Sequence, residues 1–246
     1  MKIYNGVKLE GKEADALISI EKRIKKPLKH RNFYPNDMDY FTGFYSENNT
    51  VVHLVFQYED TPKDFPTEIL KLENLKILLI NEADIKEIPE SISSLKYLKH
   101  IAFITCRNIN KLPEAIGKLK NLEELWFDFC NIEELPNSIG NLKSLRKLHL
   151  EDNKLKTLPE SIGELENLEL LYLYDNDLNY LPDSIGMLKS LKRLVLSSNP
   201  NLRELPNSLL NIKSLKHLGV DTKNLSLNSR NIVEQLRDRG VEISLL

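Results

Sequence analysis

Histidines, carboxylates and cysteines are the side chains of this 246-residue chain that are best suited to chemistry. His149 with Asp128 or Asp152 has the composition of a general acid–base pair, in which one group holds a proton that the other takes up. No nucleophile, glycine-rich phosphate loop or ligand cluster accompanies the pair in the sequence, and a catalytic site needs such groups together. We therefore expect no catalytic residue, no metal site and no cofactor, and we predict that the chain is not an enzyme.

Charge and hydropathy exclude further classes. The formal net charge of −2 balances 34 Lys and Arg against 36 Asp and Glu, whereas nucleic-acid binding needs a basic stripe. No run of about 18 apolar residues occurs, so we expect no membrane span. Acidic residues interrupt the N-terminal segment before an apolar signal core can form. These features predict a cytoplasmic protein that does not bind nucleic acid.

Prolines mark a repeat. Seven of the 11 prolines recur at intervals of 23 or 24 residues, and each follows an apolar residue: Pro66, Pro89, Pro113, Pro136, Pro159, Pro182 and Pro206. Between them runs the pattern L-x-x-L-x-L-x-x-N-x-L, as in Leu145, Leu148, Leu150, Asn153 and Leu155. This pattern and period are typical of the leucine-rich repeat, whose units of 20–29 residues stack into a solenoid.

Each repeat has two parts with different expected structures. The L-x-x-L-x-L part alternates like a short strand with its leucines turned inward. The Pro-x-Ser-Ile-Gly part suits a short helical turn, since proline is tolerated in the first turn of a helix. A single unit cannot bury enough apolar surface to be stable alone, so the units must stack. We predict an α/β solenoid: a horseshoe with a parallel concave sheet, short helical or 3₁₀ convex segments, and caps at both ends.

One position after each strand is expected to join neighbouring repeats. In the later repeats it is asparagine, whose buried amide can bridge backbone groups of successive turns: Asn153, Asn176 and Asn199. Earlier repeats have Ala83, Cys106 and Cys130 there, which indicates a weaker amide ladder at the N-terminal end. The thiols are candidates for a redox pair or a nucleophile, but we interpret them as small buried residues, because buried structural cysteines are inert. Two repeats carry one extra residue after the strand, at 106–109 and 199–202.

The ends of a solenoid expose its core and need covering. Apolar spacing predicts a helix over 11–26, followed by two strands around the turn at 46–49. A second helix is expected within 228–240, with Gly240 as its stop and a final strand in VEISLL. The predicted divisions are an N-terminal cap at 1–50, about seven to eight repeats at 51–223, and a C-terminal cap at 224–246.

The full repeat phrase, L-P-x-S-I-G-x-L-x-x-L-x-x-L-x-L-x-x-N-x-L, closely resembles the plant intracellular Ras-group-related class of leucine-rich repeats. Scaffolds that bind Ras-like GTPases carry similar repeats, as do many uncharacterised bacterial and archaeal proteins. The resemblance covers about residues 51–225. It implies protein binding by the concave face and makes a small GTPase a candidate partner by resemblance alone, because the fold does not name the ligand.

The variable positions of the concave face carry an aromatic row with an acidic border. Trp126, His149 and Tyr172 take one strand position in three successive repeats, and strands about 4.8 Å apart would place them within about 10 Å. Protein interfaces concentrate affinity in such aromatic centres. We predict that a protein or peptide with a basic or apolar contact surface binds at Trp126, Asp128, Phe129, His149, Glu151, Asp152, Tyr172, Tyr174 and Asp175. In this hypothesis the partner is anchored by Trp126, Tyr172 and Tyr174, and oriented by Asp128, Glu151 and Asp175.

Other interpretations of the same face stay open. An apolar strip precedes the aromatic row at Ile77, Leu79, Ala102 and Ile104, and aromatic side chains also fit sheet surfaces without binding anything. Four of the five histidines fall on this face, but the spacing of most pairs prevents them from sharing one metal ion: His53, His100, His149 and His217. We expect a monomeric binding module. The alternatives are a self-associating structural repeat protein and a small-molecule sensor.

Overall fold

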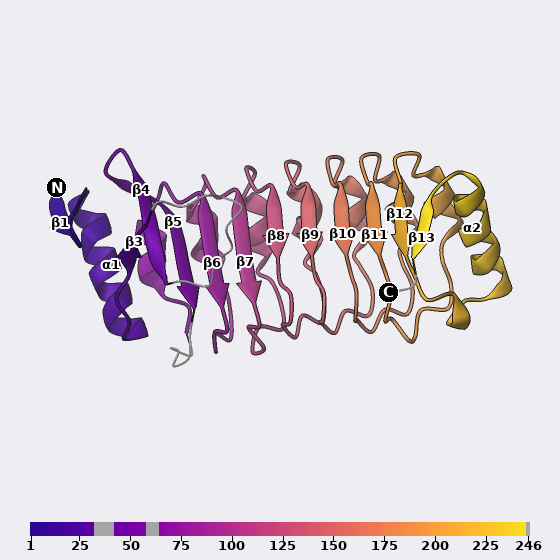
Figure 1. The fold of residues 1–246 in the computed structure, drawn as a ribbon, viewed down its shortest axis with the longest axis horizontal. Coiled ribbons are helices and arrows are strands. Elements are labelled where there is room, and N and C mark those ends of the chain that lie inside the picture. The colour runs from indigo at the N-terminus through magenta and orange to yellow at the C-terminus, as the bar shows by residue number, and fades with distance from the viewer. Residues whose placement is uncertain (32–41, 58–63, 245–246) are drawn as a thin grey trace.

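A single sheet runs the length of the molecule in the computed structural model, which describes residues 1–31, 42–57 and 64–244. Within those residues the sheet has 11 strands in the order β13 to β3, and neighbours in the sheet are neighbours in the chain (Figure 1). The pairs are parallel except β4 with β5, which are antiparallel. The strands are β3 (Lys29–His30), β4 (Gly43–Glu47), β5 (Thr50–Gln57), β6 (Ile77–Asn81), β7 (His100–Ile104), β8 (Glu124–Trp126), β9 (Lys147–His149), β10 (Leu170–Tyr172), β11 (Arg193–Val195), β12 (His217–Gly219) and β13 (Glu242–Ser244).

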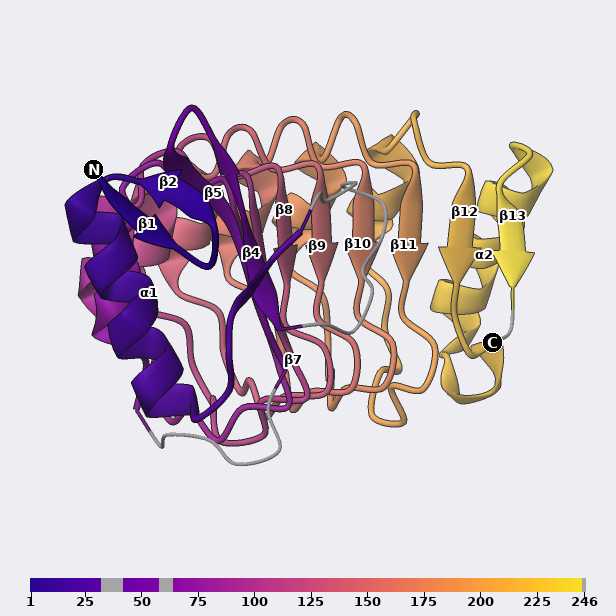
Figure 2. The same cartoon turned by 60° about the vertical axis from the view of Figure 1, so that its left-hand side comes forward.

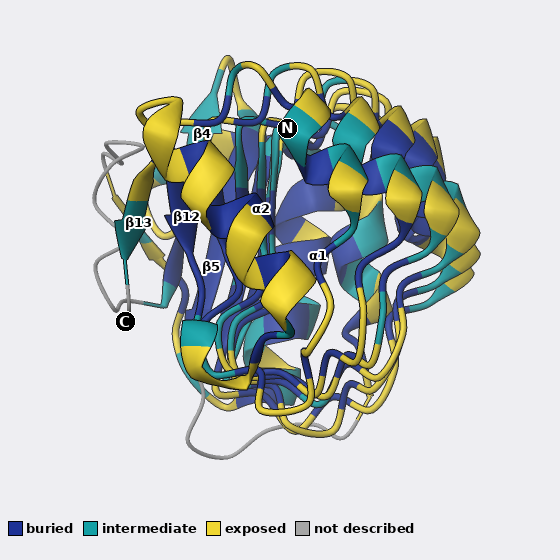
Figure 3. Ribbon diagram, turned by 90° about the vertical axis from the view of Figure 1, so that its right-hand side faces the viewer, coloured by how far each residue is buried: buried dark blue, intermediate teal, exposed yellow. Residues whose placement is uncertain are grey.

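Short 3₁₀ helices form the opposite layer. Figure 3, viewed from the C-terminal end, shows the strands on one side, the short helices on the other and buried residues between them. Seven of these helices begin directly after a repeat proline, which takes the N-cap position with an extended backbone, as the sequence predicts. They are η1 (Thr67–Lys71), η2 (Glu90–Ser94), η3 (Glu114–Lys118), η4 (Asn137–Asn141), η5 (Glu160–Glu164), η6 (Asp183–Met187) and η7 (Asn207–Asn211), and η8 (Thr222–Asn224) follows the last repeat.

The repeat leucines make one continuous core between the two layers. In the repeat that begins at Leu158, every pattern position is buried: Leu158, Ile162, Leu165, Leu168, Leu171, Leu173 and Leu178. Each buried aliphatic side chain contributes roughly 1.5–3 kcal/mol. Because the core continues from unit to unit, each repeat is stabilised chiefly by its neighbours. The predicted leucine-rich-repeat solenoid, with a parallel sheet and 3₁₀ segments opposite it, is confirmed.

Close backbone packing on the helical side depends on glycine. A methyl group placed on the α-carbon of Gly163 would lie 2.4 Å from the backbone oxygen of Ser184 in the next repeat. The same serine-over-glycine contact recurs at Gly117, Gly140 and Gly186. The Ser-Ile-Gly phrase therefore serves packing between repeats.

Amides join the later repeats in the predicted ladder. Asn176 Nδ2 donates to the carbonyl of Leu150 at 2.8 Å, and its Oδ1 accepts the N–H of Leu155 at 3.0 Å. Asn153 and Asn199 make equivalent bonds to the repeat before each of them. The amides thus satisfy backbone groups that would otherwise be buried without a partner.

The N-terminal end carries elements outside the repeat. A hairpin of β1 (Lys2–Tyr4) and β2 (Val7–Leu9) precedes helix α1 (Gly11–Ile24), which packs against η1 (Figure 2). The β4–β5 hairpin then turns at Asn48 and Asn49, whose φ angles of 49° and 66° are left-handed. The start of the first predicted strand, at 38–41, lies outside the described residues.

The C-terminal end also carries a helix and a strand outside the repeat. Helix α2 (Leu227–Asp238) packs against η7, and Ser226 caps it by accepting the N–H of Ser229 at 3.2 Å. Gly240 follows with a φ of 90°, and β13 then pairs in parallel with β12. No described helix is long and apolar enough to cross a membrane.

Candidate partner-binding face

The strand register brings the aromatic row together. Trp126 pairs with His149 across β8 and β9, and His149 pairs with Tyr172 across β9 and β10. The rings of Trp126 and His149 stack with centroids 3.9 Å apart and planes 14° apart. The rings of His149 and Tyr172 stack at 4.4 Å and 24°. We call these three side chains the aromatic stack.

His149 acts in this stack as a neutral ring. Burial lowers the pKa of His149 to about 4, because removal from water disfavours the charged imidazolium. Its Nδ1 lies 4.0 Å from Oδ2 of Asp128, so the predicted acid–base pair is near but not hydrogen-bonded. Within the described residues no group of three or more His, Cys, Asp or Glu side chains could hold a metal ion.

The acidic residues beside the stack fall into two kinds. Asp128 is only 6% exposed, although we predicted that it would orient a partner on this face. Its Oδ1 accepts the N–H of Glu151 at 2.8 Å, and burial raises its pKa to about 7. Asp152 and Asp175 are exposed, and Glu151 is half-buried with a pKa raised by burial. The exposed acidic border thus consists of Asp152 and Asp175, whereas Asp128 is buried.

The residue directly before the asparagine or cysteine position has an unusual backbone in the middle repeats. Phe129, Asp152 and Asp175 have φ angles of 55°, 51° and 53°, in the left-handed region that side chains other than Asn, Asp and Gly seldom adopt. Equivalent angles occur at Glu82, Thr105 and Ser198. The conformation therefore belongs to the repeat and is not special to the candidate site. Phe129 is the bulkiest of the six, and its ring is 42% exposed.

Tyr174 and the apolar strip complete the face. Tyr174 is half-buried on the repeat that holds Tyr172. Of the strip on the earlier strands, Ile77 and Ala102 are buried, whereas Leu79 and Ile104 are half-buried. The register Leu79–Ala102–Trp126 makes this strip continuous with the aromatic stack.

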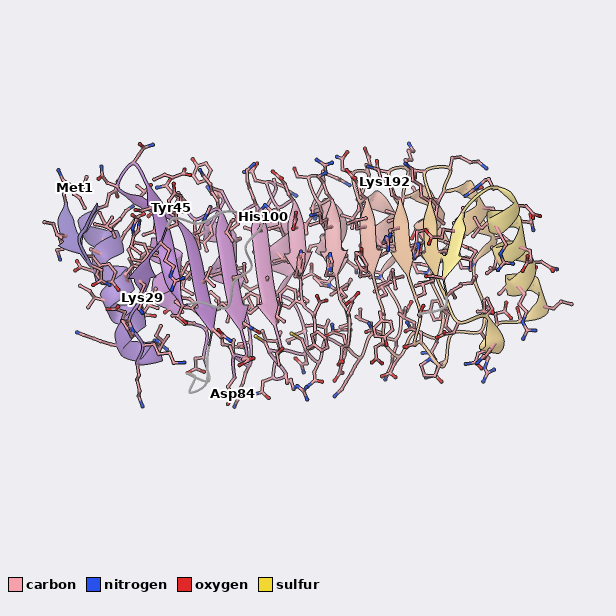
Figure 4. The ribbon with its side chains drawn as sticks, viewed as in Figure 1. Met1, Lys29, Tyr45, Asp84, His100 and Lys192 are labelled. Carbon is pink, nitrogen blue, oxygen red and sulfur yellow. The ribbon has the colours of Figure 1, made fainter. Side chains whose placement is uncertain are left out.

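A row of ion pairs, which we did not predict from the sequence, crosses the edge where the strands begin. Lys99 Nζ lies 2.8 Å from Glu123, while Glu169 pairs with both Arg146 and Lys192. Figure 4 shows Lys192 at this edge and Asp84 at the opposite one. These charges recur with the repeat period, each directly before the first residue of a strand. That recurrence in the sequence could have predicted the row.

A second row of charges lies one position further along the strands. Glu124 bridges two neighbours, with Oε1 2.8 Å from Lys147 Nζ and Oε2 3.5 Å from His100 Nδ1. The hydrogen bond to His100 and the bond to Lys147 lower the pKa of Glu124 to about 2. A hollow of about 320 Å³ is lined by charged residues of both rows and by Leu170: the charged residues are Glu123, Glu124, Arg146, Lys147 and Glu169. Its charges are mostly paired with one another.

Comparison with known proteins agrees with this geometry. Stacked 23- or 24-residue units with a parallel sheet define a class of solenoid proteins, and a family model described as a leucine-rich repeat region matches residues 51–136 and 135–238. The chain therefore belongs to the leucine-rich repeat proteins, a family whose members generally bind other proteins and are generally not catalytic. No curated protein matches the sequence.

Solved structures share the fold at low sequence identity. The leucine-rich repeat domain of the type III effector XopL is 22% identical with a TM-score of 0.61, over 79% of this chain and 76% of that one. A plant ice-binding protein is 20% identical with a TM-score of 0.63, over 87% and 81%. An internalin, inlF, from Listeria monocytogenes is 14% identical with a TM-score of 0.59, over 79% and 61%. At these identities the likeness concerns the fold alone.

Proposed function

We propose that the protein is a non-catalytic module that binds a protein or peptide partner on the concave face of its sheet. The aromatic stack carries this proposal, because three ring side chains are aligned across β8, β9 and β10 beside exposed carboxylates. Aromatic side chains surrounded by polar groups supply most of the binding energy in many protein interfaces. Trp126 and Tyr172 anchor the partner, with Tyr174 alongside.

The charges beside the stack favour a partner with a basic contact surface. Asp152 and Asp175 are exposed next to the stack, and Glu151 is half-buried. In an interface, such charges orient the partner and speed its association. Asp128 supports this border indirectly, since its carboxylate holds the backbone of Glu151. A small GTPase as the partner, a cytoplasmic location and a monomeric state stay predictions.

Affinity capture from a lysate of the source organism tests the proposal. The wild type is compared with the double variant Trp126→Ala/Tyr172→Ala, and every captured protein is then produced pure and its dissociation constant measured. We expect at least a tenfold weaker constant for the double variant, because truncating an anchor costs about 2 kcal/mol or more.

A matched control removes two other aromatic rings. Tyr97 and Tyr180 are more than half exposed and lie outside the stack, so Tyr97→Ala/Tyr180→Ala should bind as the wild type does. Circular dichroism verifies that all variants are folded. Equal capture by the wild type and the stack variant would refute the proposal. A mass that rises with concentration in light scattering, lost in the stack variant, would support the self-associating alternative instead.

A further inference from the structure

The concave-face side chains of strand β10 form a line along the strand that crosses the aromatic stack at Tyr172. Leu170, Tyr172 and Tyr174 alternate with buried leucines, so all three lie on this face, and each is half-buried. The parallel ladder continues beyond β10 as far as Asp175, whose N–H donates to the carbonyl of Ser197 at 3.1 Å. At about 3.3 Å per residue, the line from Leu170 to Asp175 is roughly 15 Å long. An extended segment of about five residues has this length.

Positive charge flanks the start of this line. Leu170 pairs with Arg193 on β11 and with Lys147 on β9, so a cation lies on each side of it. Lys147 is paired with Glu124, and Glu169, directly before Leu170, is shared by two other cations. The half-buried side chain of Arg193 forms no ion pair or hydrogen bond with any residue that the structure describes. Its guanidinium group therefore has a charge that no carboxylate of the described chain balances.

Negative charge lies at the other end of the line. Asp152 and Asp175 take the same place in successive repeats, and both are exposed. The N–H of Asp152 donates to the carbonyl of Tyr174 at 2.9 Å, which holds the two aspartates on neighbouring turns. Among the described residues, neither carboxylate has a cation or a hydrogen-bond donor as a partner. The two ends of the line thus carry unpaired charges of opposite sign, with aromatic side chains between them.

We propose that the partner is recognised through a segment that lies along β10, with an acidic group at Arg193 and a basic group at Asp152 and Asp175. Apolar side chains between these groups contact Tyr172 and Tyr174. The inference rests on the proposed function and adds the direction and the charge pattern of the bound segment. A carboxylate fits Arg193 because the planar guanidinium group forms paired hydrogen bonds with it. The reversed segment would place like charges together at both ends, which is unfavourable.

Four labelled peptides of one length and with one apolar middle test the charge pattern. The first has two glutamates at one end and two lysines at the other. The second has glutamates at both ends, the third has lysines at both, and the fourth has one glutamate and one lysine at each end. In fluorescence anisotropy titrations we expect the first to bind at least tenfold more tightly than the fourth, which has the same composition and net charge. Equal affinity of these two peptides, or no binding of the first at millimolar concentration, would overturn the proposal.

Charge variants assign each end of the peptide to its side chains. Arg193→Glu should weaken binding of the first peptide at least tenfold and make the doubly basic peptide the tightest ligand. Asp152→Asn/Asp175→Asn should bind the first and the doubly acidic peptide with similar affinity, because asparagine keeps the left-handed backbone and removes the charge. The control Lys118→Glu/Asp183→Asn changes exposed charges on η3 and η6 and should bind all four peptides as the wild type does. An unchanged order of affinities in a folded Arg193→Glu would refute the inference.

The natural partner distinguishes this inference from the broader proposal. If Arg193→Glu captures the partner like the wild type while Trp126→Ala/Tyr172→Ala loses it, the face binds a protein but not through a segment with this charge pattern. If the Trp126 and Tyr172 variant also captures it fully, the proposed function itself is wrong.

Discussion

The earlier and the later repeats are held together in different ways. In the later repeats, Asn153, Asn176 and Asn199 bond to the backbone of the preceding repeat through both amide atoms. In the earlier ones, Cys106 and Cys130 reach only carbonyl oxygens, at 3.5–3.8 Å. The repeats of Ala83 and Cys106 have longer strands instead, since β6 and β7 each have five residues, whereas β8, which precedes Cys130, has three like β9 to β12.

The extra residue in the loop at 106–109 explains why the next repeat has Cys130 in place of asparagine. In the loop at 106–109, the N–H of Ile109 bonds to the carbonyl of Cys106 at 3.0 Å. That N–H corresponds to the one on Ile132 that Asn153 accepts in the following repeats. An asparagine at position 130 would therefore find no free donor for its oxygen, whereas a cysteine needs none. The comparison shows that a local insertion determines which side chain the neighbouring repeat can use.

The largest predicted effect is at Asn176, in the middle of the amide ladder. Asn176→Ala leaves the N–H of Leu155 and the carbonyl of Leu150 buried without their partner. We expect a loss of about 3 kcal/mol in the free energy of unfolding, measured by urea denaturation, because each orphaned group costs about 1–3 kcal/mol. Cys106→Ala is the control from the earlier repeats and should cost about 1 kcal/mol. Equal losses at both positions would remove the distinction between the two regions.

Helical-side packing gives the next largest effect. In Gly163→Ala the new methyl group meets the backbone of Ser184, which cannot move independently of its repeat. We expect a loss of about 2 kcal/mol from overpacking, measured as a lower urea midpoint. Ser93 occupies the equivalent place in an earlier repeat, and Ser93→Ala should change stability by less than about 0.5 kcal/mol. A tolerated Gly163→Ala would mean that the repeats separate easily.

Buried carboxyl groups test whether the two regions unfold together. Burial raises the pKa of Glu13, in α1, and of Asp128, in the middle of the sheet, to about 7. The native protein therefore holds these two protons more tightly than the unfolded chain does. Proton binding by these groups stabilises the native state fully below about pH 4, and this contribution is lost as the pH rises through 7. His53 and His149 have the opposite pH dependence, since burial lowers the pKa of each to about 4. Their neutral rings stabilise the native state above pH 6.5, and this stabilisation is lost as the pH falls below that value.

Glu13→Gln and Asp128→Asn isolate the carboxyl effect, because the histidines are the same in all three proteins. We expect each variant to gain about 1–2 kcal/mol relative to the wild type between pH 5 and pH 8 in urea titrations. If both variants shift one common transition, the array unfolds as a unit. If Glu13→Gln shifts only an earlier transition, the N-terminal repeats open separately. A constant difference across this pH range would show that neither carboxyl group titrates as stated.

The smallest predicted effect is at the boundary between the regions. Cys130→Asn restores the repeat consensus, but the donor that its oxygen needs is already bonded within the loop at 106–109. We expect a loss of about 1 kcal/mol, measured by urea denaturation. Deleting one residue from that loop together with the substitution should recover part of the loss. A more stable Cys130→Asn would show that the loop can release its N–H.

The sequence predicted the repeated structure well because the same constraint occurs many times. Leucine spacing, proline phase and the asparagine position each recur, so errors at one repeat are corrected by the others. Both terminal helices were also predicted from their apolar spacing. The β1–β2 hairpin was missed, although its turn at Asn5-Gly6 has the residue pair that two-residue hairpins prefer, and both residues have left-handed backbones.

Contacts between repeats were harder to predict than the repeats themselves. The row of Trp126, His149 and Tyr172 follows from the register, but the burial of Asp128 depends on a backbone N–H in the next repeat. The place of a residue in the repeat pattern predicts which face of the sheet its side chain lies on, but not which neighbouring residue covers it. Whether the predicted site residues bind a partner depends on a second molecule and is a question for the capture experiment.

The 23-residue spacing also has an evolutionary consequence. A tandem copy of residues 154–176 would bring its own glycine at the helical turn and its own asparagine, and would meet matching surfaces on both sides. A copy of residues 84–106 would bring Ser93 and Cys106 instead, and its loop would lack an amide to bond. Gene duplication can therefore lengthen this array within the later repeats at little cost in stability. Longer descendants of the chain should have gained their additional units there, and kept the boundary at Cys130 unchanged.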